Sequence, residues 1–539
     1  MATGAELTYT TNVSALTMAN AIFGNGTTVV GASLNVPNTS TAKGLYANGQ
    51  LSPGVTPAES GIILSTGDIR SFTQSSGDPN RLAFTSGDSN GTDNDAQFNA
   101  IAGAQTFDGV WLNVDFIPTG STMTMRFVLS SEEYPEYINS DFNDVMGVWV
   151  NGAYVPVVVG SGESSVNNIN AASQENLVRN NTNDAFNTEM DGFTITLSLT
   201  MQVNPGVVNS IRIGVADTTD NRYDTNILIP ADSVQAVLVP QADAVTIHPS
   251  DTVTLNVLAN DQAQATLTIT HLNGVAVVAG QTVTLPSGQT VTLNADGTLT
   301  IVGDGQAESK AFTYSLADTL GNTATGIVTV NQVPCFVAGT RILTARGEVA
   351  VERLVPGDLV MTLDDGLQPL RWTGQRTVLA AGPMAPVRLN AGAFGRHRTL
   401  WLSPQHRVLI RDPRAELLFG EAEVLVAAQD LVNGTSVMPV PGGEVTYVHL
   451  LFDRHQVICS EGLATESFQP GPVILSAMDD AERAEIASLF PELARVAAQS
   501  GRPALGCIPA ARRVLRRHEA QVLFRRTRKA GPTAARCAA

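Results

Sequence analysis

Short segments in which hydrophobic and polar residues alternate recur throughout the first 238 residues. Residues 109–116, 123–129 and 210–215 are examples, and turn-forming residues separate them. Alternation with a period of two, together with β-branched and aromatic side chains, predicts strands that bury one face. Many such strands in one region are typical of packed sheets. Residues 1–238 are therefore predicted to form an all-β sandwich or jelly roll.

The same alternation continues in a shorter unit, residues 239–333. Within it, residues 290–301 read as two strands joined at Asp296-Gly297, a dipeptide typical of hairpin turns. Several more short strands are expected on either side of this hairpin. A small unit built from short strands fits an immunoglobulin-like β-sandwich.

The composition changes at residue 335, and the pattern becomes helical after Gly471. Ser476 followed by Asp479 is an arrangement that caps the start of a helix, and a second helix is expected over residues 511–526. The chain is thus predicted to be mainly β, with a short α-helical tail over residues 472–539.

Charge divides the chain at the same place. Residues 1–334 contain 30 acidic and eight basic side chains, whereas residues 335–539 contain 20 acidic and 24 basic ones. Such a split indicates two parts with different roles. Residues 511–536 are basic, but no aromatic or recognition motif accompanies them, so nucleic acid is not expected as a partner. Docking of this tail on the preceding domain or on the acidic first part is the favoured interpretation.

The N-terminal sequence and the cysteines only partly restrict the cellular compartment of the protein. The N-terminus lacks the basic start and apolar run of a secretory signal peptide, and no stretch is long and apolar enough to span a membrane. All four cysteines lie after residue 334 without a CxxC pair, which suggests neither a zinc site nor a disulfide framework. Cys459, in an apolar segment, is expected to be a packing residue.

Three sequence blocks follow one another between residues 335 and 458. Residues 335–360 begin with CFVAGTRILT and end with VPGDLV, residues 400–410 read LWLSPQHRVLI, and residues 447–458 read YVHLLFDRHQVI. In this order they resemble a bacterial Hint domain, the hedgehog/intein self-processing module. The resemblance covers residues 335–471 and implies an all-β, horseshoe-like fold.

The resemblance makes Cys335 the nucleophile and the Pro334-Cys335 peptide the bond that breaks. A thiol beside the carbonyl can convert the amide into a thioester by an N-to-S acyl shift, and no cofactor is required. The departing nitrogen needs a proton, which His406 is expected to supply because imidazole exchanges protons near neutral pH. Ser403, where relatives generally have Thr, is expected to hydrogen-bond the scissile amide.

A second cluster of candidate catalytic residues contains His449, Asp453 and His455. If one strand carried all three, their side chains would face the same way and converge on one site. Structural hydrogen bonding is an equal alternative for Asp453 and His455. The His-Asn ending that splicing inteins use is absent from residues 463–468, so full splicing is not expected, and the ring of Pro334 is expected to slow cleavage.

Two motifs in the acidic first part, VLSSEEYPEYINSDFNDVMGVWVNG and GVADTTDNRYDTNILIPADS, resemble the choice-of-anchor L domain of bacterial secreted proteins. Phrases in residues 239–333 such as NVLANDQ and LNADGTLTI resemble cadherin-like repeats of bacterial adhesins. The first domain offers clustered carboxylates that suit Ca²⁺, namely Glu132, Glu133, Asp144, Asp217, Asp220 and Asp224. A solvated acidic face is an equal alternative.

Two functions fit these observations. The first is an exported multidomain protein whose Hint domain cleaves its own backbone once, with that backbone as substrate. The second is a non-catalytic adhesin with a degenerate Hint domain and a cell-surface or matrix ligand. An extracellular location without an N-terminal signal rests on the resemblance alone, which leaves a cytoplasmic location open.

Overall fold

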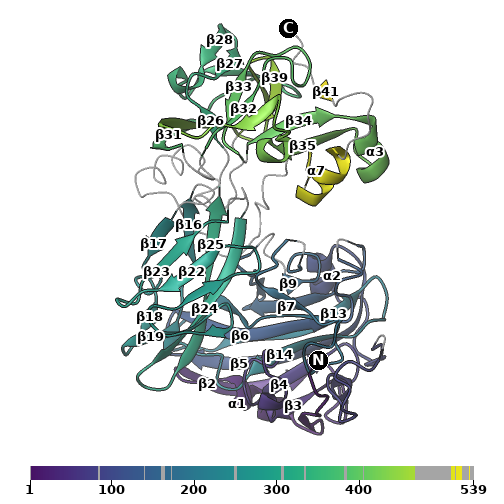
Figure 1. The fold of residues 1–539 in the computed structure, drawn as a ribbon. Coiled ribbons are helices and arrows are strands. Elements are labelled where there is room, and N and C mark those ends of the chain that lie inside the picture. Colours follow the sequence, from purple (N-terminus) through teal and green to yellow (C-terminus); the bar gives the residue numbers. More distant parts are fainter. Residues whose placement is uncertain are drawn as a thin grey trace.

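The computed structural model describes residues 2–82, 85–138, 140–159, 164–171, 173–247, 252–304, 309–332, 335–380, 385–404, 406–467, 511–515, 517–524 and 533–534. The chain is mainly β, which confirms the predicted fold class (Figure 1). No helix within the described ranges has the length and apolar character needed to cross a membrane.

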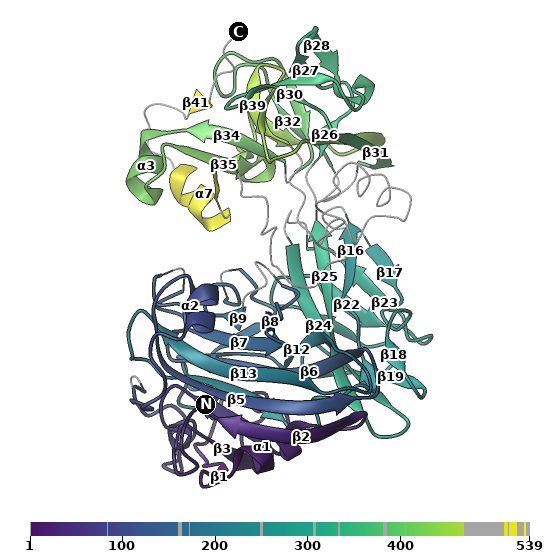
Figure 2. The same cartoon turned by 180° about the vertical axis from the view of Figure 1, so that it is seen from behind.

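Two antiparallel sheets form the N-terminal sandwich, residues 2–239 of the described chain. The first sheet has the order β1 (Thr8–Thr10), β3 (Lys43–Ala47), β4 (Gly61–Ser65), β14 (Thr225–Pro230), β6 (Thr122–Ser131), β11 (Gly192–Thr194) and β10 (Val178–Asn180), with β12 (Leu197–Gln202) also on β6. The second has the order β2 (Thr27–Leu34), β5 (Thr106–Pro118), β13 (Asn209–Thr218), β7 (Val145–Val150) and β8 (Ala153–Tyr154), with β9 (Ser164–Ser165) on β7 (Figure 2).

The core of this sandwich follows the alternation in the sequence. Along β5, Val110, Leu112, Val114 and Phe116 are buried, and every second residue of β6 from Met123 to Leu129 joins the same apolar cluster. Helix α1 (Ala15–Ile22) begins where Ser14 accepts a hydrogen bond from the Thr17 amide, and α2 (Ala96–Ala102) begins where Asp95 accepts from two amides. Two 3₁₀ turns complete the domain, η1 (Gly49–Leu51) and η2 (Ile69–Ser71).

The second sandwich, described residues 240–332, is smaller. One sheet has the order β16 (Asp243–Ile247), β25 (Thr323–Gln332), β24 (Ser309–Asp318), β19 (Leu267–Leu272) and β20 (Val275–Ala276), and the other β17 (Thr252–Leu255), β23 (Leu299–Val302), β22 (Thr290–Leu293) and β21 (Thr282–Thr284). Strand β18 (Gln262–Ala263) pairs with β15 (Leu238–Val239). The predicted hairpin is β22–β23, and Gly297 in its turn has a φ of 84°, which glycine adopts readily.

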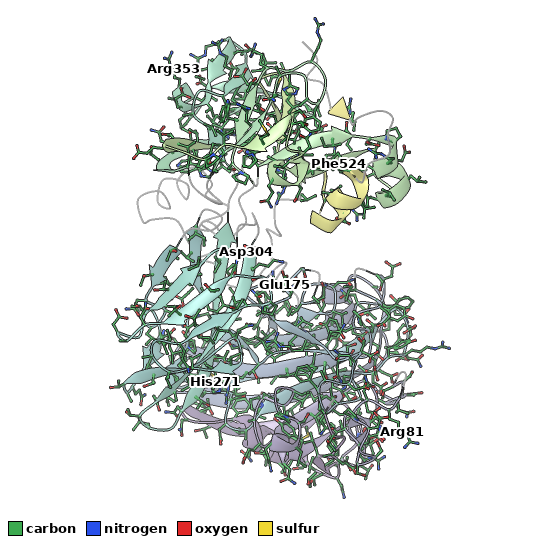
Figure 3. The ribbon with its side chains drawn as sticks, in the orientation of Figure 1. Arg81, Glu175, His271, Asp304, Arg353 and Phe524 are labelled. Carbon is green, nitrogen blue, oxygen red and sulfur yellow. The ribbon has the colours of Figure 1, made fainter. Side chains whose placement is uncertain are left out.

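The two sandwiches contact each other directly. Lys310 Nζ lies 2.5 Å from a carboxylate oxygen of Glu175, which Figure 3 labels. Ser198 Oγ donates to the carbonyl of Thr325 over 2.5 Å, and the side-chain Nε2 of Gln235 donates to the carbonyl of Thr323 on β25 over 2.8 Å. These polar contacts hold the second sandwich against β12 and the end of the first domain.

The C-terminal domain, the described residues from 335 onward, contains two further sheets. The first has the order β31 (Trp372–Leu379), β37 (Glu444–Leu451), β26 (Phe336–Val337), β33 (Leu400–Leu402), β32 (Val387–Leu389) and β36 (Val437–Pro439). The second has the order β28 (Gly347–Ala350), β27 (Arg341–Thr344), β29 (Leu359–Thr362), β38 (Val457–Ser460), β39 (Leu463–Glu466), β34 (Arg407–Arg411), β35 (Glu423–Ala427) and β40 (Arg513–Val514), with β30 (Gly366–Pro369) on β29 and β41 (Thr533–Ala534) on β34. Short helical elements are η3 (Val351–Arg353), α3 (Pro413–Phe419), η5 (Ala428–Leu431) and α7 (Arg517–Phe524).

The tail differs from the prediction of one helix over residues 511–526. Its first residues form β40, which pairs in parallel with β35, and only α7 is helical. Arg512 forms ion pairs with Asp364 and Glu423, so this part of the tail docks on the C-terminal domain. The predicted cap at Ser476 and Asp479 lies outside the described residues.

The cysteines also differ from expectation. Cys459 is buried, as expected of a packing residue, but it is also disulfide-bonded, which its isolated position in the sequence did not suggest. Cys335 is a buried thiol that is not part of a disulfide. Isolated cysteines give no pairing signal in sequence, because a disulfide depends on which segments the fold brings together.

Candidate active site around Cys335

Cys335 immediately precedes β26, the strand between β37 and β33. Phe336 pairs with Leu402 of β33 and with Val448 of β37. Because both pairings are antiparallel, the next residues on the neighbouring strands, Ser403 and His449, flank Cys335. Residues that are far apart in the sequence thus meet at the thiol.

Ser403 holds the backbone of Cys335 from one side. The Cys335 amide donates to Ser403 Oγ over 2.8 Å, and the Ser403 amide donates to the Cys335 carbonyl over 3.0 Å. Both residues are buried. The hydroxyl is therefore within hydrogen-bond reach of the nitrogen that would leave if the preceding peptide bond broke, where Ser403 was predicted.

His449 approaches the sulfur from the other side. Its Nε2 lies 3.3 Å from Cys335 Sγ, and its ring is half-buried on β37. An imidazole nitrogen at this distance can take the thiol proton and so generate the more nucleophilic thiolate. Tyr447, two residues earlier on the same face, packs with Cys335, and burial followed by the nearby Cys335 raises the pKa of its phenol.

His406 lies on the opposite side of β26 from this pair. Its ring contacts Phe336 with 4.1 Å between ring centroids, and burial lowers its pKa to about 4. The nearby Glu466 and the backbone of Cys335 raise the pKa, but less than burial lowers it. His406 is therefore neutral near pH 7, which differs from the expected proton exchange near neutral pH. Among the described residues, neither ring nitrogen makes a hydrogen bond of good geometry.

A buried carboxylate, Glu466 at the end of β39, faces His406. Glu466 accepts from the Arg407 amide over 2.9 Å and from its guanidinium over 3.1 Å. His455 Nε2 lies 3.3 Å from the same carboxylate. Burial alone would raise the pKa of Glu466, but Arg407, His455 and His406 outweigh it and hold the pKa at about 2. An ionised carboxylate is thus kept in the core beside the histidine.

The orientation of His455 follows from its other ring nitrogen. The amide of Ala511, at the start of the docked tail, donates to His455 Nδ1 over 3.0 Å. A neutral ring that accepts at Nδ1 carries its proton on Nε2, which is the nitrogen that faces Glu466. His455 is therefore one step removed from Cys335, and its direct partner is the carboxylate.

Asp453 is not brought to the site. Strand β37 ends at Leu451, so residues 449, 453 and 455 do not share one strand as expected. Asp453 lies in the connection to β38 and forms a two-pronged ion pair with Arg371, with about half of its side chain exposed. Pro334 lies outside the described residues, and so does Val333.

Sequence reasoning missed Glu466 and Arg407. Glu466 lies in the segment that was considered only for its missing His-Asn ending. A lone acidic residue at the end of the short, otherwise uncharged strand 463–466 was the available signal, because a buried carboxylate needs a cationic or hydrogen-bonding partner. The partner, Arg407, is brought to Glu466 by the pairing of β34 with β39.

The predicted carboxylates of the first domain gather at one end of the sandwich. Glu132 and Glu133 follow β6, Asp144 precedes β7, Asp217 lies near the end of β13, and Asp224 precedes β14. Pairing of β6 with β14 and of β7 with β13 brings these strand ends together. All five are buried, whereas Asp220 is partly exposed. A solvated acidic face therefore does not describe these five residues.

Burial raises the pKa of each buried carboxyl, and neighbouring carboxylates add to the effect. The pKa is about 8 for Glu132, about 10 for Glu133, about 7 for Asp144 and about 6 for Asp224. Burial and then Asp144 raise the pKa of Asp217 strongly, and among the described residues neither of its carboxylate oxygens makes a hydrogen bond of good geometry. Within the described residues, however, no three acidic, histidine or cysteine side chains are arranged as a metal site.

Comparison with known families divides the chain into three matched parts. The choice-of-anchor L domain matches residues 7–235, the bacterial Ig domain residues 235–331, and the Hint domain residues 334–472. These matches, in this order, confirm the predicted resemblances, and the spacer matches a bacterial Ig domain.

Among curated proteins, no sequence matches this chain. A solved structure of the M60 catalytic domain with the CBM51-1 and CBM51-2 domains from Clostridium perfringens ZmpB is 10% identical, with a TM-score of 0.13 over 82% of this chain. The matched region spans 41% of that chain. This likeness is too low to carry an argument about fold or function.

Proposed function

Because the chain joins a choice-of-anchor L domain, a bacterial Ig domain and a Hint domain, we propose that Cys335 cleaves, once, the peptide bond that precedes it. The observation that carries the proposal is the thiol flanked by a base and a hydroxyl. His449 Nε2 lies 3.3 Å from the sulfur, and Ser403 Oγ lies 2.8 Å from the Cys335 nitrogen.

In the proposed first step the thiol proton moves to His449 and the sulfur attacks the carbonyl carbon of Pro334. The C–S bond forms as the C–N bond to Cys335 breaks, which leaves a thioester on sulfur and a free amine on Cys335. Holding sulfur and carbonyl within one dipeptide removes the entropy cost of bringing them together.

The departing nitrogen must gain a proton for this step to proceed. Ser403 Oγ already contacts that nitrogen, and His406 lies beside the same backbone on the other face of the strand. His406 has to gain a proton first, and the ionised Glu466 next to it favours that charged form. Glu466 and His455 are thus positioning residues that act through His406.

The proposed reaction ends without splicing. No His-Asn pair occupies the segment around Glu466, so water or an outside nucleophile releases the first two domains. The choice-of-anchor L and Hint domains support a multidomain surface protein. The disulfide at Cys459 is a second support for an extracellular location, because disulfides persist mainly in oxidising compartments.

Incubation of the purified full chain with dithiothreitol tests the proposal. A thiol exchanges with the thioester, so the wild type is expected to yield two fragments, and Cys335→Ala none. Loss of His449 or Ser403 is expected to slow fragment formation about 10²–10⁴-fold, the range for general acid–base groups. Asp453→Asn is the matched control on the same domain and should cleave like the wild type. Equal cleavage rates for His449→Ala and wild type would contradict the assigned base.

The alternative function, a non-catalytic adhesin, needs only the two sandwiches and their mutual contacts. It predicts that the wild type stays intact in dithiothreitol under conditions in which a folded Hint domain is present. Both proposed functions include a surface or matrix ligand for the first domain.

A further inference from the structure

The face of the sheet that carries Cys335 also carries a cavity. Residues two apart on a strand share a face, so Val337 lies on the same side of β26 as Cys335, about 7 Å further along. Across the sheet, Val337 pairs with Tyr447 of β37, and the register of β33 places Trp401 opposite it. A cavity of about 440 Å³ opens there.

The cavity is in contact with the surroundings of the thiol. Val337, Ala380 and Val445 line it, and the same three side chains pack with Cys335 and Tyr447 in one cluster. Cys335 itself is fully buried behind them. An acyl group attached to the sulfur would therefore be approached from this face.

The remaining walls combine apolar residues, among them Trp401, Pro386 and Val440, with polar ones, and two carboxylates border the cavity. Glu461 is already neutralised, because Arg398 lies 2.5 Å from it and the Arg341 amide donates to its other oxygen. Glu444 is exposed and forms no ion pair within the described part of the chain. The carboxylate of Glu444 therefore gives the cavity a negative charge that a cationic ligand can pair with.

We propose that this cavity binds the nucleophile that resolves the Cys335 thioester, and that this nucleophile is a primary amine on an apolar chain, such as a lysine side chain. The apolar residues of the wall hold the aliphatic chain, and Glu444 attracts the ammonium group, which loses its proton to solvent before it reacts. This inference rests on the proposed self-cleavage.

The reaction is balanced without a cofactor. The neutral amine nitrogen attacks the thioester carbonyl, a C–N bond forms, and the C–S bond breaks. The proton lost by nitrogen passes to the sulfur, which regenerates the Cys335 thiol. The product is an amide that joins the first two domains to the amine, so the Hint domain would attach the surface module to another molecule.

The experiment presents the full chain with n-butylamine or glycine at equal concentrations of free amine, and with dithiothreitol in a parallel sample. Mass spectrometry of the released N-terminal fragment measures butylamide, glycine adduct, free acid and thiol-cleaved product. The wild type is expected to give about tenfold more butylamide than glycine adduct, since a few methylene contacts discriminate by about this factor.

Glu444→Gln, an exposed substitution, is expected to lower the ratio of butylamide to thiol-cleaved product several-fold, and Trp401→Ala to lower it further. Glu416→Gln on α3 is the control, because Glu416 is an exposed glutamate outside the cavity, and it should keep the wild-type ratio. An unchanged ratio in Glu444→Gln, equal yields of the two adducts, or free acid alone at every amine concentration would overturn the inference. Absence of thiol-cleaved product would instead overturn the proposed self-cleavage.

Discussion

Two sets of buried carboxylates, one in the Hint domain and one in the N-terminal sandwich, show opposite pKa shifts. In the Hint domain, Glu466 is surrounded by Arg407, His455 and His406, and its pKa falls to about 2. At the end of the choice-of-anchor L sandwich, Asp144, Asp217 and their neighbours face one another, and burial and mutual repulsion raise their pKa values.

This difference shows what a buried charge needs. A carboxylate leaves water at a large cost, which an ion pair with good geometry offsets and which protonation avoids. Glu466 follows the first route and stays ionised beside a histidine of the proposed active site. The sandwich cluster follows the second route unless a cation enters. The two regions are therefore expected to respond oppositely to mutation, pH and divalent cations.

The largest effect is expected from Glu466→Gln. The substitution keeps the shape but leaves the partly buried Arg407 charge without its partner, so the free energy of unfolding of the Hint domain should fall by about 3 kcal/mol, the lower end of the range for buried pairs. Urea unfolding with Hint-domain peptides followed by hydrogen exchange measures it. Glu416→Gln, at an exposed position, should change stability by less than about 0.5 kcal/mol. Equal stabilities of the two variants would mean that the ion pair between Glu466 and Arg407 does not stabilise the domain.

Changing the pH should separate the two regions. The folded-state pKa of His406 is about 4 against an ordinary 6.5, and that of Glu466 about 2 against 4.5. The unfolded Hint domain therefore binds more protons, and its stability is lost as the pH falls from about 6.5 to 2. The raised carboxyl pKa values of the sandwich have the opposite effect, because the folded sandwich binds more protons than the unfolded chain. The stability that these carboxyls contribute is fully present below about pH 4 and is lost as the pH rises through about 6–10.

Peptide-resolved thermal proteolysis at pH 5 and pH 8 measures both domains in one sample. The sandwich is expected to melt higher at pH 5 than at pH 8, and the Hint domain lower. If the melting temperatures of both domains shift in the same direction between pH 5 and pH 8, the opposite pKa shifts of the two regions are contradicted.

Calcium is expected to raise the melting temperature of the sandwich by a few degrees at pH 8, because a cation that binds only the folded state stabilises it. The buried carboxylate of Asp217, which makes no hydrogen bond of good geometry with the described part of the chain, is the observation behind this expectation. Asp217→Asn should abolish the shift, and the Hint domain should show none. If millimolar Ca²⁺ leaves the melting temperature of the wild-type sandwich unchanged, its carboxyls do not bind the cation.

The smallest effect is expected from Asp453→Asn, which removes a half-exposed ion pair with Arg371. Such surface pairs contribute about 0–1 kcal/mol, so urea unfolding of the Hint domain should change by no more than this. A larger loss would show that Asp453 has a structural role beyond the surface.

Alternation and turn chemistry were sufficient to predict the mainly β fold and the β22–β23 hairpin, because both are local properties of the chain. Cys335, Ser403 and His449 could be singled out because each lies in a block with a recognisable order, and the fold brings the three together; their catalytic roles stay a prediction. Glu466, Arg407 and the disulfide at Cys459 could not, because their partners are set by strand pairing. Asp453 was misplaced for the same reason, since the end of β37 at Leu451 depends on its neighbours.

The most direct test of the central claim is the mass of the fragments released from the full chain by dithiothreitol. The account predicts one fragment that begins at Cys335 and one that ends at Pro334 with the thiol attached through a thioester, and neither from Cys335→Ala. A wild-type chain that keeps its full mass, although Cys335 reacts with a thiol reagent once the protein is unfolded, would contradict it.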